Sequence, residues 1–405
     1  MKILFLGSLV SQESMEELNK NSTVKASVAP VNYETMLVKG LVENGAEVEA
    51  LSVPAVAAFP GSKYKFMHKK DESLDFGVKI KWLPFVNVQF VKQLTVKMST
   101  KKALRKWLKG NKDTEDKLVM MYSIYPPYTD PAVKLCKKYG CHLNTVITDL
   151  PEYMYTWKNS KGLRGMYANK IKNDMLRLQN SCDSYILFTK KMVSRMGILQ
   201  KPHIVSEGFC DESIFNDIPE QTKYEKKTIV YGGNLSKLYG IESLVNAFMK
   251  TKGDYELHLY GMGADSSYIE KCAKKDERIK FFGRVPRNEL LCSLKKASLL
   301  VINKPQSDDY SNYSFSSKIL EYMTSGTPVL TTRVGGMPKE YYDYFYFIDD
   351  ETEEGISRAI SQVLEMSKED LCALGNKARN FCVSQKNYKS QCKKIKLFLE
   401  DMIQN

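Results

Sequence analysis

Short apolar runs alternate with longer segments of helical spacing along the first half of the chain. The runs KILFL, EVEALSV, KIKWLPF, KLVMMYS and LNTVITDL are typical of buried strands, and the segments NYETMLVKGLVENG and PAVKLCKKYG are typical of helices. Strands that alternate with crossover helices predict a parallel sheet covered on both faces. We therefore expect residues 1–207 to form a Rossmann-like, doubly wound α/β domain.

A second series of the same kind begins at residue 227. Its predicted strands are TIVYGG, YELHLYG, IKFFG, SLLVIN and TPVLTT, and its predicted helices include GIESLVNAFMK, RNELLCSLKKA and SSKILEYMTSG. The polar stretch 208–226 between the two series is expected to be a linker. We expect a second Rossmann-like domain over 227–385 that faces the first across a cleft, and a C-terminal helix over 386–405 that packs back on the first domain.

Composition and charge restrict the class of protein. The 405 residues are 43% hydrophobic and 26% charged, which excludes disordered and fibrous chains. The nine cysteines include no C-x-x-C pair, which argues against a zinc site or a disulfide framework. The N-terminal run MKILFLGSLV is expected to be a strand rather than a signal peptide, and no apolar run is long enough to span a bilayer. These features favour a cytoplasmic protein whose membrane contacts are peripheral.

The densest chemistry lies in the segment NYSFSSKILEYMTSGTPVL. Ser316 and Ser317 lie at the expected start of a helix, where backbone N–H groups and hydroxyls favour a phosphate, and Lys318 adds a positive charge. Glu321 follows three residues later on the same side of the helix, where its carboxylate could accept hydrogen bonds from the diol of a ribose. A surface ion pair between Lys318 and Glu321 explains the same spacing equally well.

This segment, YSFSSKILEYMTSGTPVL, resembles the corresponding motif of bacterial glycosyltransferases of family 4, which are retaining enzymes with the GT-B fold that build capsular polysaccharides and exopolysaccharides. The segments YGGNLSKLYGIESLVNAF and LHLYGMGADSSYIEKCAKKDERIKFFGRV resemble the same family, as do ASVAPVNYETMLVKGL and VITDLPEYM in the first half. The resemblance implies that the first domain binds the acceptor and the second binds a nucleotide sugar.

The resemblance also implies roles for single residues. Glu321 would bind the ribose, and Ser316, Ser317 and Lys318 would hold the diphosphate. The backbone around Arg284 and Val285 would meet the base.

Other positions depart from the family pattern. An arginine is usual directly after Gly233, where this chain has Asn234, and a lysine is usual where it has Tyr239. Lys237 is close enough along the chain to replace this cation pair. Tyr313 stands where many relatives have a glutamate that contacts the donor sugar, and Ser316 stands where the motif has a proline.

The chemistry of glycosyl transfer sets what the site must provide. Negative charge develops on the departing diphosphate, which a helix N-terminus with Lys318 and Lys237 could stabilise. No Asp-x-Asp motif with a nearby histidine suggests a divalent ion, so we expect a reaction without metal, and no cofactor beyond the nucleotide sugar is implied. Asp149, at the end of a predicted strand, is the candidate for orienting the acceptor hydroxyl, although it could equally cap the following turn. Gly7, Ser27 and Asn32 are expected to line the cleft.

A basic segment runs from Lys92 to Lys112, with eight lysines or arginines and no acidic residue. On a helix, Leu104, Trp107 and Leu108 share one side, and Lys102, Lys106 and Lys109 lie opposite. This pattern is typical of an interfacial helix on an anionic membrane, with Trp107 among the contacts. The alternative is a solvated helix that packs its Leu/Trp edge on the sheet. Nucleic acid is not expected, since no nucleic-acid-binding module accompanies the charge.

Taken together, the sequence predicts a retaining, metal-independent glycosyltransferase. It would move a sugar from a nucleotide sugar, with UDP favoured, to a lipid-linked or saccharide acceptor at the inner face of the cell membrane. Two alternatives remain open: a nucleotide-sugar 2-epimerase of similar architecture, and a non-catalytic protein that binds nucleotide sugar as the partner of another transferase.

Overall fold

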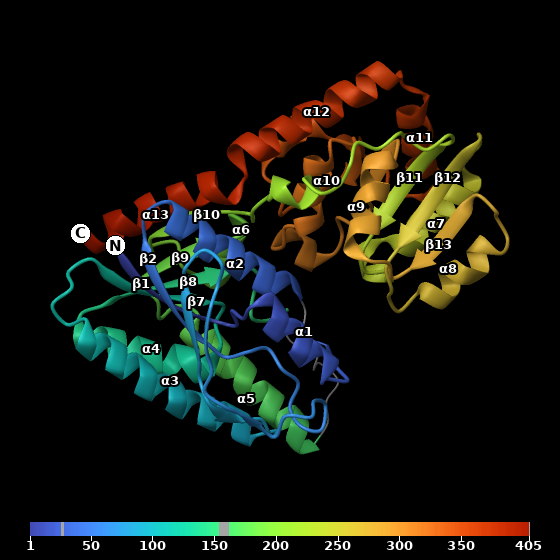
Figure 1. Cartoon of the computed structure of the whole chain (residues 1–405). Helices are drawn as coiled ribbons and strands as arrows, with labels where there is room; N and C mark the ends of the chain where they lie inside the picture. The colour runs from blue at the N-terminus through green and yellow to red at the C-terminus, as the bar shows by residue number, and fades with distance from the viewer. Residues whose placement is uncertain (26–27, 154–161, 405) are drawn as a thin grey trace. The chain divides into compact units, whose positions relative to one another are not determined.

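The structure is a computed structural model that describes residues 1–25, 28–153 and 162–404. The chain divides into two compact units. The first unit comprises Met1–Glu207 with Tyr388–Asn405, and the second comprises Gly208–Asn387. Figure 1 shows the helices and strands of each unit.

The first unit is built on a mostly parallel sheet. Its strands lie in the order β10 (His203–Val205), β9 (Ser184–Leu187), β8 (His142–Ile147), β7 (Lys117–Tyr122), β1 (Lys2–Gly7), β2 (Glu47–Ser52), β5 (Lys79–Trp82) and β4 (Asp71–Ser73). Only β4 runs antiparallel to its neighbour in this sheet, among the described strands. The central strands are buried on both faces, as the continuous apolar runs of β1 and β7 require. A short antiparallel pair, β3 (Phe66–Met67) with β6 (Phe85–Val86), lies outside the sheet.

Helices cover both faces of this sheet (Figure 1). Helices α3 (Val91–Gly110), α4 (Pro126–Tyr139) and α5 (Gly162–Leu178) form one layer, in which α3 packs on α4 and α4 on α5. Helix α2 (Val28–Glu43) packs against α13 (Tyr388–Gln404), and α1 (Gln12–Lys20) and α6 (Lys191–Met196) complete the unit. None of the helices within the described ranges is long and apolar enough to cross a membrane.

Helix α13 returns to the first unit through a close approach to α2. A Cβ atom on Gly40 would lie 2.6 Å from the Cys392 sulfur and 2.8 Å from the Tyr388 carbonyl oxygen, so only glycine lets the two helices pack this closely. Asn44 adds a hydrogen bond to the Lys389 carbonyl at 3.0 Å. The last helix of the chain is thus an integral part of the first unit.

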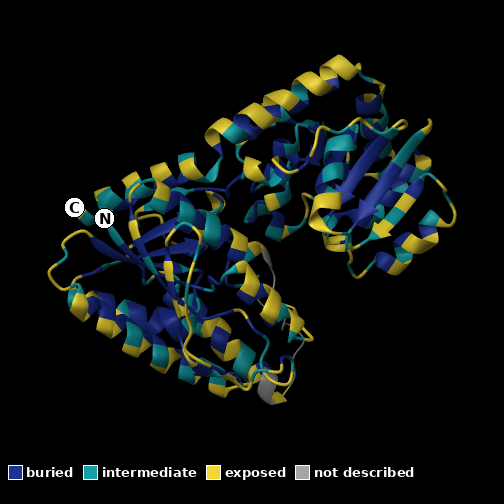
Figure 2. Cartoon of the chain, viewed as in Figure 1, coloured by how far each residue is buried: buried dark blue, intermediate teal, exposed yellow. Residues whose placement is uncertain are grey.

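The second unit has a wholly parallel sheet. Its strands lie in the order β13 (Ile279–Gly283), β12 (Tyr255–Tyr260), β11 (Lys227–Gly232), β14 (Leu299–Ile302), β15 (Val329–Thr332) and β16 (Tyr346–Ile348). Figure 2 shows its central strands as buried. One face carries α7 (Ile241–Lys250), α8 (Ser266–Ala273) and α11 (Glu353–Glu365), and the other carries α9 (Arg287–Lys296), α10 (Ser317–Ser325) and α12 (Lys368–Gln385).

The segment predicted as a linker, 208–226, is instead part of the second unit. Phe215 and Ile218 are buried in the apolar core beside α10 and α12, and Tyr224 packs against the same core. Lys223 donates hydrogen bonds to the carbonyl oxygens of Lys295 and Ala297 at the end of α9. The sparse apolar residues of this segment are too irregular for a periodic pattern to reveal, which is why the sequence alone suggested a linker.

Candidate active site

The N-terminus of α10 lies at the edge of the second sheet where parallel strands end. Ser316 is the residue that precedes the first turn, and its backbone is extended, as at a helix start. Its side chain forms no capping hydrogen bond within the described chain, and Ser317 is exposed. Two hydroxyls and the first N–H groups of the helix are thus available for an anionic ligand.

Lys318 reaches from α10 to the end of β11. Its Nζ donates a hydrogen bond to the Tyr231 hydroxyl at 2.9 Å, and it lies over the rings of Tyr231 and Tyr239, with 4.5 and 5.2 Å between Nζ and the ring centroids. Burial among these groups lowers the pKa of Lys318 to about 8. An amine desolvated in this way gains strongly from an arriving anion, because a second charge would restore the interaction lost from water.

Gly233 makes the position of Lys318 possible. Its φ of +152° favours glycine, and a Cβ atom there would overlap the ammonium group of Lys318. The structure therefore brings together two candidates, Gly233 and Lys318, that lie 85 residues apart in the sequence.

Glu321 is held by an arginine rather than by Lys318. Its Oε2 accepts a hydrogen bond from Nη2 of Arg287, the first residue of α9, at 3.0 Å. The predicted surface pair between Lys318 and Glu321 is therefore not formed, although the carboxylate still acts on Lys318 by raising its pKa against the larger effect of burial. Arg284 and Val285 follow β13 in the loop that leads to Arg287, and Val285 packs against the core.

The remaining second-unit candidates are spread more widely. Lys237 is 83% exposed and pairs with Glu242 at 3.4 Å, so its amine is directed along the surface of α7. The carbonyl of Asn234 accepts a hydrogen bond from the Tyr231 hydroxyl at 2.9 Å. Tyr313 follows a 3-10 helix, Asp309–Asn312, in the loop that leads to α10. The catalytic role of Lys237 stays a prediction.

Sequence reasoning did not single out Lys304, a buried cation that contacts the loop before α10. Lys304 follows β14 directly, is only 6% exposed, donates to the Ser314 hydroxyl at 2.7 Å and lies over the Tyr310 ring. The sequence places Lys304 at the end of a predicted strand, and the same position at a strand end singled out Asp149.

In the first unit, Gly7 lies against a buried carboxylate that the sequence did not single out. Glu34, on α2, is fully buried and accepts hydrogen bonds from the backbone N–H of Ser8 at 2.7 Å and from its hydroxyl at 2.6 Å. A Cβ atom on Gly7 would overlap this carboxylate. Burial raises the pKa of Glu34 to about 7 against the opposing effect of its hydrogen bonds. Asn32 is exposed on α2, and Ser27 lies outside the described residues.

Asp149 lies at the end of β8, as the strand pattern predicted. Its carboxylate accepts a hydrogen bond from the Thr148 hydroxyl at 3.2 Å, and Thr148 also meets the Tyr122 hydroxyl at 3.3 Å. Because β1, β7 and β8 are neighbouring parallel strands, these polar groups and Ser8 follow the same edge of the sheet. The role of Asp149 in orienting the acceptor stays a prediction.

In the basic helix α3, the predicted membrane contact of Trp107 is wrong. Leu104, Trp107 and Leu108 are buried, and the Trp107 indole donates to Glu49 at 3.2 Å, so Trp107 is not at the surface and cannot contact a membrane as predicted. The alternative, packing of this edge on the sheet, is what the structure has. The exposed side of α3 instead carries Met98 and five cations, which line a groove: Lys101, Lys102, Arg105, Lys106 and Lys109.

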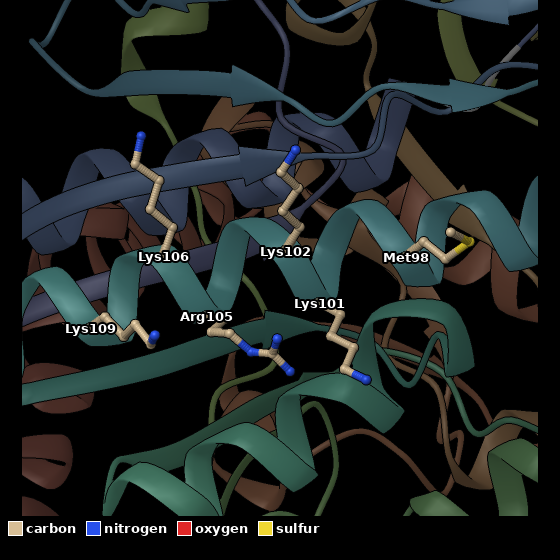
Figure 3. A pocket seen from close by; sticks show the side chains of 6 residues that line it. All are labelled: Met98, Lys101, Lys102, Arg105, Lys106 and Lys109. Carbon is tan, nitrogen blue, oxygen red and sulfur yellow. The ribbon is translucent and has the colours of Figure 1, made fainter.

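Figure 3 shows Lys102 and Lys106 extending from one side of α3 and Lys101, Arg105 and Lys109 from the other. None of these five cations forms an ion pair with another described residue, whereas Lys97 of the same helix pairs with Asp130 at 2.7 Å. The helix therefore presents uncompensated positive charge along its exposed side.

No group of three or more His, Cys, Asp or Glu side chains within 1–25, 28–153 and 162–404 could hold a metal ion, and the nine cysteines are free thiols.

Comparisons with known proteins bear on the fold and on the second unit. Residues 213–381 match the family model "Glycosyl transferases group 1". N-acetyl-alpha-D-glucosaminyl L-malate synthase of Bacillus anthracis is 23% identical over 244 residues, an alignment that spans 58% of this chain and 55% of that protein. Sucrose-phosphate synthase of Thermosynechococcus elongatus superposes with a TM-score of 0.66 at 13% identity over the whole of both chains. Anabaena HepE in complex with UDP gives 0.61 at 13% identity over 99% of this chain and all of that one.

The two Rossmann-like units with parallel sheets are those of the GT-B glycosyltransferase fold. The matched model covers the unit that holds Lys318 and Glu321, and together with the relative it indicates a transferase.

The buried carboxylate of Glu34 predicts a pH dependence of stability. Its pKa is about 7 in the folded chain against an ordinary 4.5, so the folded state retains a proton that the unfolded state loses between these values. This contribution to stability is complete below pH 4.5 and is lost as pH rises through 7, which amounts to about 3 kcal/mol. We expect Glu34→Gln to remove this part of the dependence of the unfolding free energy on pH, whatever its effect on absolute stability. Urea denaturation between pH 5 and 8 measures it, and parallel slopes for both proteins would contradict the expectation.

Proposed function

We propose that this protein is a retaining, metal-independent glycosyltransferase that moves a sugar from a UDP-sugar to a lipid-linked saccharide in the synthesis of a surface polysaccharide. The observation that carries the proposal is the arrangement at the N-terminus of α10. There Lys318 lies beside Gly233 and the free helix end, and Glu321 lies one turn deeper. A cation and N–H donors for a diphosphate stand one helical turn from a carboxylate for a ribose.

The reaction mainly requires that the site stabilise the charge on the leaving group. The glycosidic bond of the donor breaks as negative charge develops on the diphosphate, and preorganised donors in a partly desolvated site stabilise that charge most effectively. Lys318 and the first N–H groups of α10 meet this demand without a metal ion. Ser316 and Ser317 add hydroxyl donors at the same helix end.

UDP as the carrier is supported by a structural relative. HepE, whose fold matches along nearly the whole chain, binds UDP. The relative from Bacillus anthracis is named as the synthase of N-acetyl-alpha-D-glucosaminyl L-malate, but the alignment spans little more than half of that protein.

The acceptor is proposed to bind at the edge of the first sheet, where β1, β7 and β8 end. Asp149 would orient the attacking hydroxyl, and Thr148 and Tyr122 would support Asp149 through the hydrogen bonds at 3.2 and 3.3 Å. In a retaining reaction of this fold the departing phosphate can take the acceptor's proton, so Asp149 need not act as a strong base.

Membrane contact at the inner face of the cell membrane is proposed through α3. Its exposed side begins with Val91, Leu94 and Met98, which are 42%, 60% and 64% exposed, and continues with the five cations that pair with no described acidic residue. Apolar side chains beside uncompensated positive charge suit an anionic leaflet. A protein held there could reach an acceptor whose lipid stays in the bilayer.

The ribose role of Glu321 gives the direct test of the proposed function. We expect Glu321→Ala to weaken UDP binding by roughly 1.5 to 3 kcal/mol, because a charge-assisted contact is lost. Calorimetry measures this, with Glu365→Ala, an exposed glutamate at the end of α11, as the control.

The reaction is tested by nucleotide release from a UDP-sugar with and without saccharide acceptors, in the presence of EDTA. Release that depends on an acceptor supports the transferase. Epimerised donor without any acceptor would support the 2-epimerase, and UDP binding without turnover would support the non-catalytic partner.

We expect Lys318→Ala to lower kcat about 100-fold with a smaller change in UDP affinity, because its charge matters most as the diphosphate leaves. Steady-state kinetics and calorimetry separate the two effects. Lys226→Ala is the control, since Lys226 is an exposed lysine paired with Asp254 before β11. A change in KM alone would assign Lys318 to binding and leave the departing charge to another group.

The proposed membrane contact predicts a loss of vesicle binding when α3 loses charge. Changing Lys102, Lys106 and Lys109 to Gln removes about 1 kcal/mol per lysine, so binding to vesicles rich in anionic lipid should fall about 100-fold. The matched control changes Lys271, Lys274 and Lys275, which are exposed in the second unit, and removes the same net charge. Sedimentation at low and high salt measures binding, and equal pelleting of the two triple variants would exclude α3 as the contact.

A further inference from the structure

The ion pair between Arg287 and Glu321 joins the starts of α9 and α10. Nη2 of Arg287 lies 3.0 Å from Oε2 of Glu321, and the two side chains are 55% and 22% exposed. Exposed pairs of this kind contribute little to stability. Loss of this pair is therefore expected to leave the fold intact.

Arg287 lies on the side of α9 that faces the candidate site. Leu290, one turn later on the same side of the helix, packs against Gly232 at the end of β11, next to Gly233 and Lys318. Arg287 also begins the helix that follows the loop of Arg284 and Val285, and its side chain pairs with Glu321. A nucleoside whose ribose is bound by Glu321 would have its base within reach of Arg287.

We infer that Arg287 is a specificity-determining residue that orients Glu321 and reads a carbonyl oxygen on the base of the bound nucleotide. This inference rests on the proposed function. Arg287 engages Oε2 through one nitrogen, and Oε1 of Glu321 receives no hydrogen bond from the described residues. A carboxylate has about four acceptor positions, so Glu321 can accept from the arginine and from a ribose diol at the same time.

The chemistry of the guanidinium sets the preference among bases. Arginine has about five N–H donors and no acceptor, and it keeps its charge at any physiological pH. The donors that do not contact Glu321 can pair with a carbonyl oxygen, as uracil offers. Adenine has no carbonyl oxygen, and its exocyclic amino group would place donor against donor at the position where uracil has a carbonyl oxygen. Arg287 thus favours UDP over ADP.

The test compares the affinities of UDP and ADP for the full-length protein and for Arg287→Ala by calorimetry. We expect the wild type to bind UDP more tightly. In Arg287→Ala, UDP affinity should fall about tenfold and ADP affinity by no more than about twofold, so that the preference for uracil shrinks. Arg287→Lys keeps the charge but not the planar fork, and it should restore less than half of the lost preference.

The matched control is Arg358→Ala, because Arg358 is 63% exposed and forms a comparable surface ion pair, with Asp350 at 2.6 Å. It should leave both affinities unchanged. Thermal unfolding without nucleotide verifies that each variant is folded.

The outcomes separate this inference from the proposed function. Wild-type binding of UDP that is unchanged in Arg287→Ala overturns the inference alone. Equal losses for UDP and ADP also overturn it, because they assign Arg287 to the ribose or the diphosphate, which both nucleotides share, rather than to the base. A wild type that binds neither nucleotide overturns the proposed function and the inference together.

Discussion

The candidate site of the second unit depends on the close approach of Lys318 to the backbone of Gly233, which has no side chain. Lys318 can lie against the end of β11 only because Gly233 leaves the space, and the rings of Tyr231 and Tyr239 then enclose its amine. Burial lowers the pKa of this amine to about 8, which makes an anion the natural occupant of the helix end beside it. The interaction between Arg287 and Glu321 extends the same site by one helical turn.

The first unit repeats this construction with the opposite charge. Gly7 is the last residue of β1, and Gly233 directly follows β11. Beside Gly233 the space is filled by the amine of Lys318, and beside Gly7 it is filled by the carboxylate of Glu34. Hydrogen bonds from Ser8 hold the carboxylate against the loop after β1, and burial raises its pKa to about 7. A glycine at the end of the first strand of each sheet thus gives a titratable side chain access to the edge where ligands of such sheets bind.

Helix α3 illustrates how packing selects among the faces of an amphipathic segment. Leu104, Trp107 and Leu108 form its most apolar stripe, and burial of this stripe stabilises the helix against the rest of the first unit. What remains at the surface is the stripe of cations that Figure 3 shows, preceded by Leu94 and Met98. The apolar side chains available to a partner are therefore different from those that the sequence pattern favoured.

The sequence by itself determined the α/β class, both series of strands and helices, and the helix start at Ser316, because periodicity and N-terminal capping are local properties of the chain. It also singled out Gly233, Lys318 and Glu321, which a motif of adjacent residues and a resemblance could reveal. Only the tertiary structure decided that segment 208–226 belongs to the second unit, that Glu321 pairs with Arg287, and that Glu34 lies buried beside Gly7. The physical reason is that these features depend on which segments, distant along the chain, share a layer or the edge of a sheet. Burial, ion pairing and pKa follow from that proximity, and no local pattern of residues encodes it.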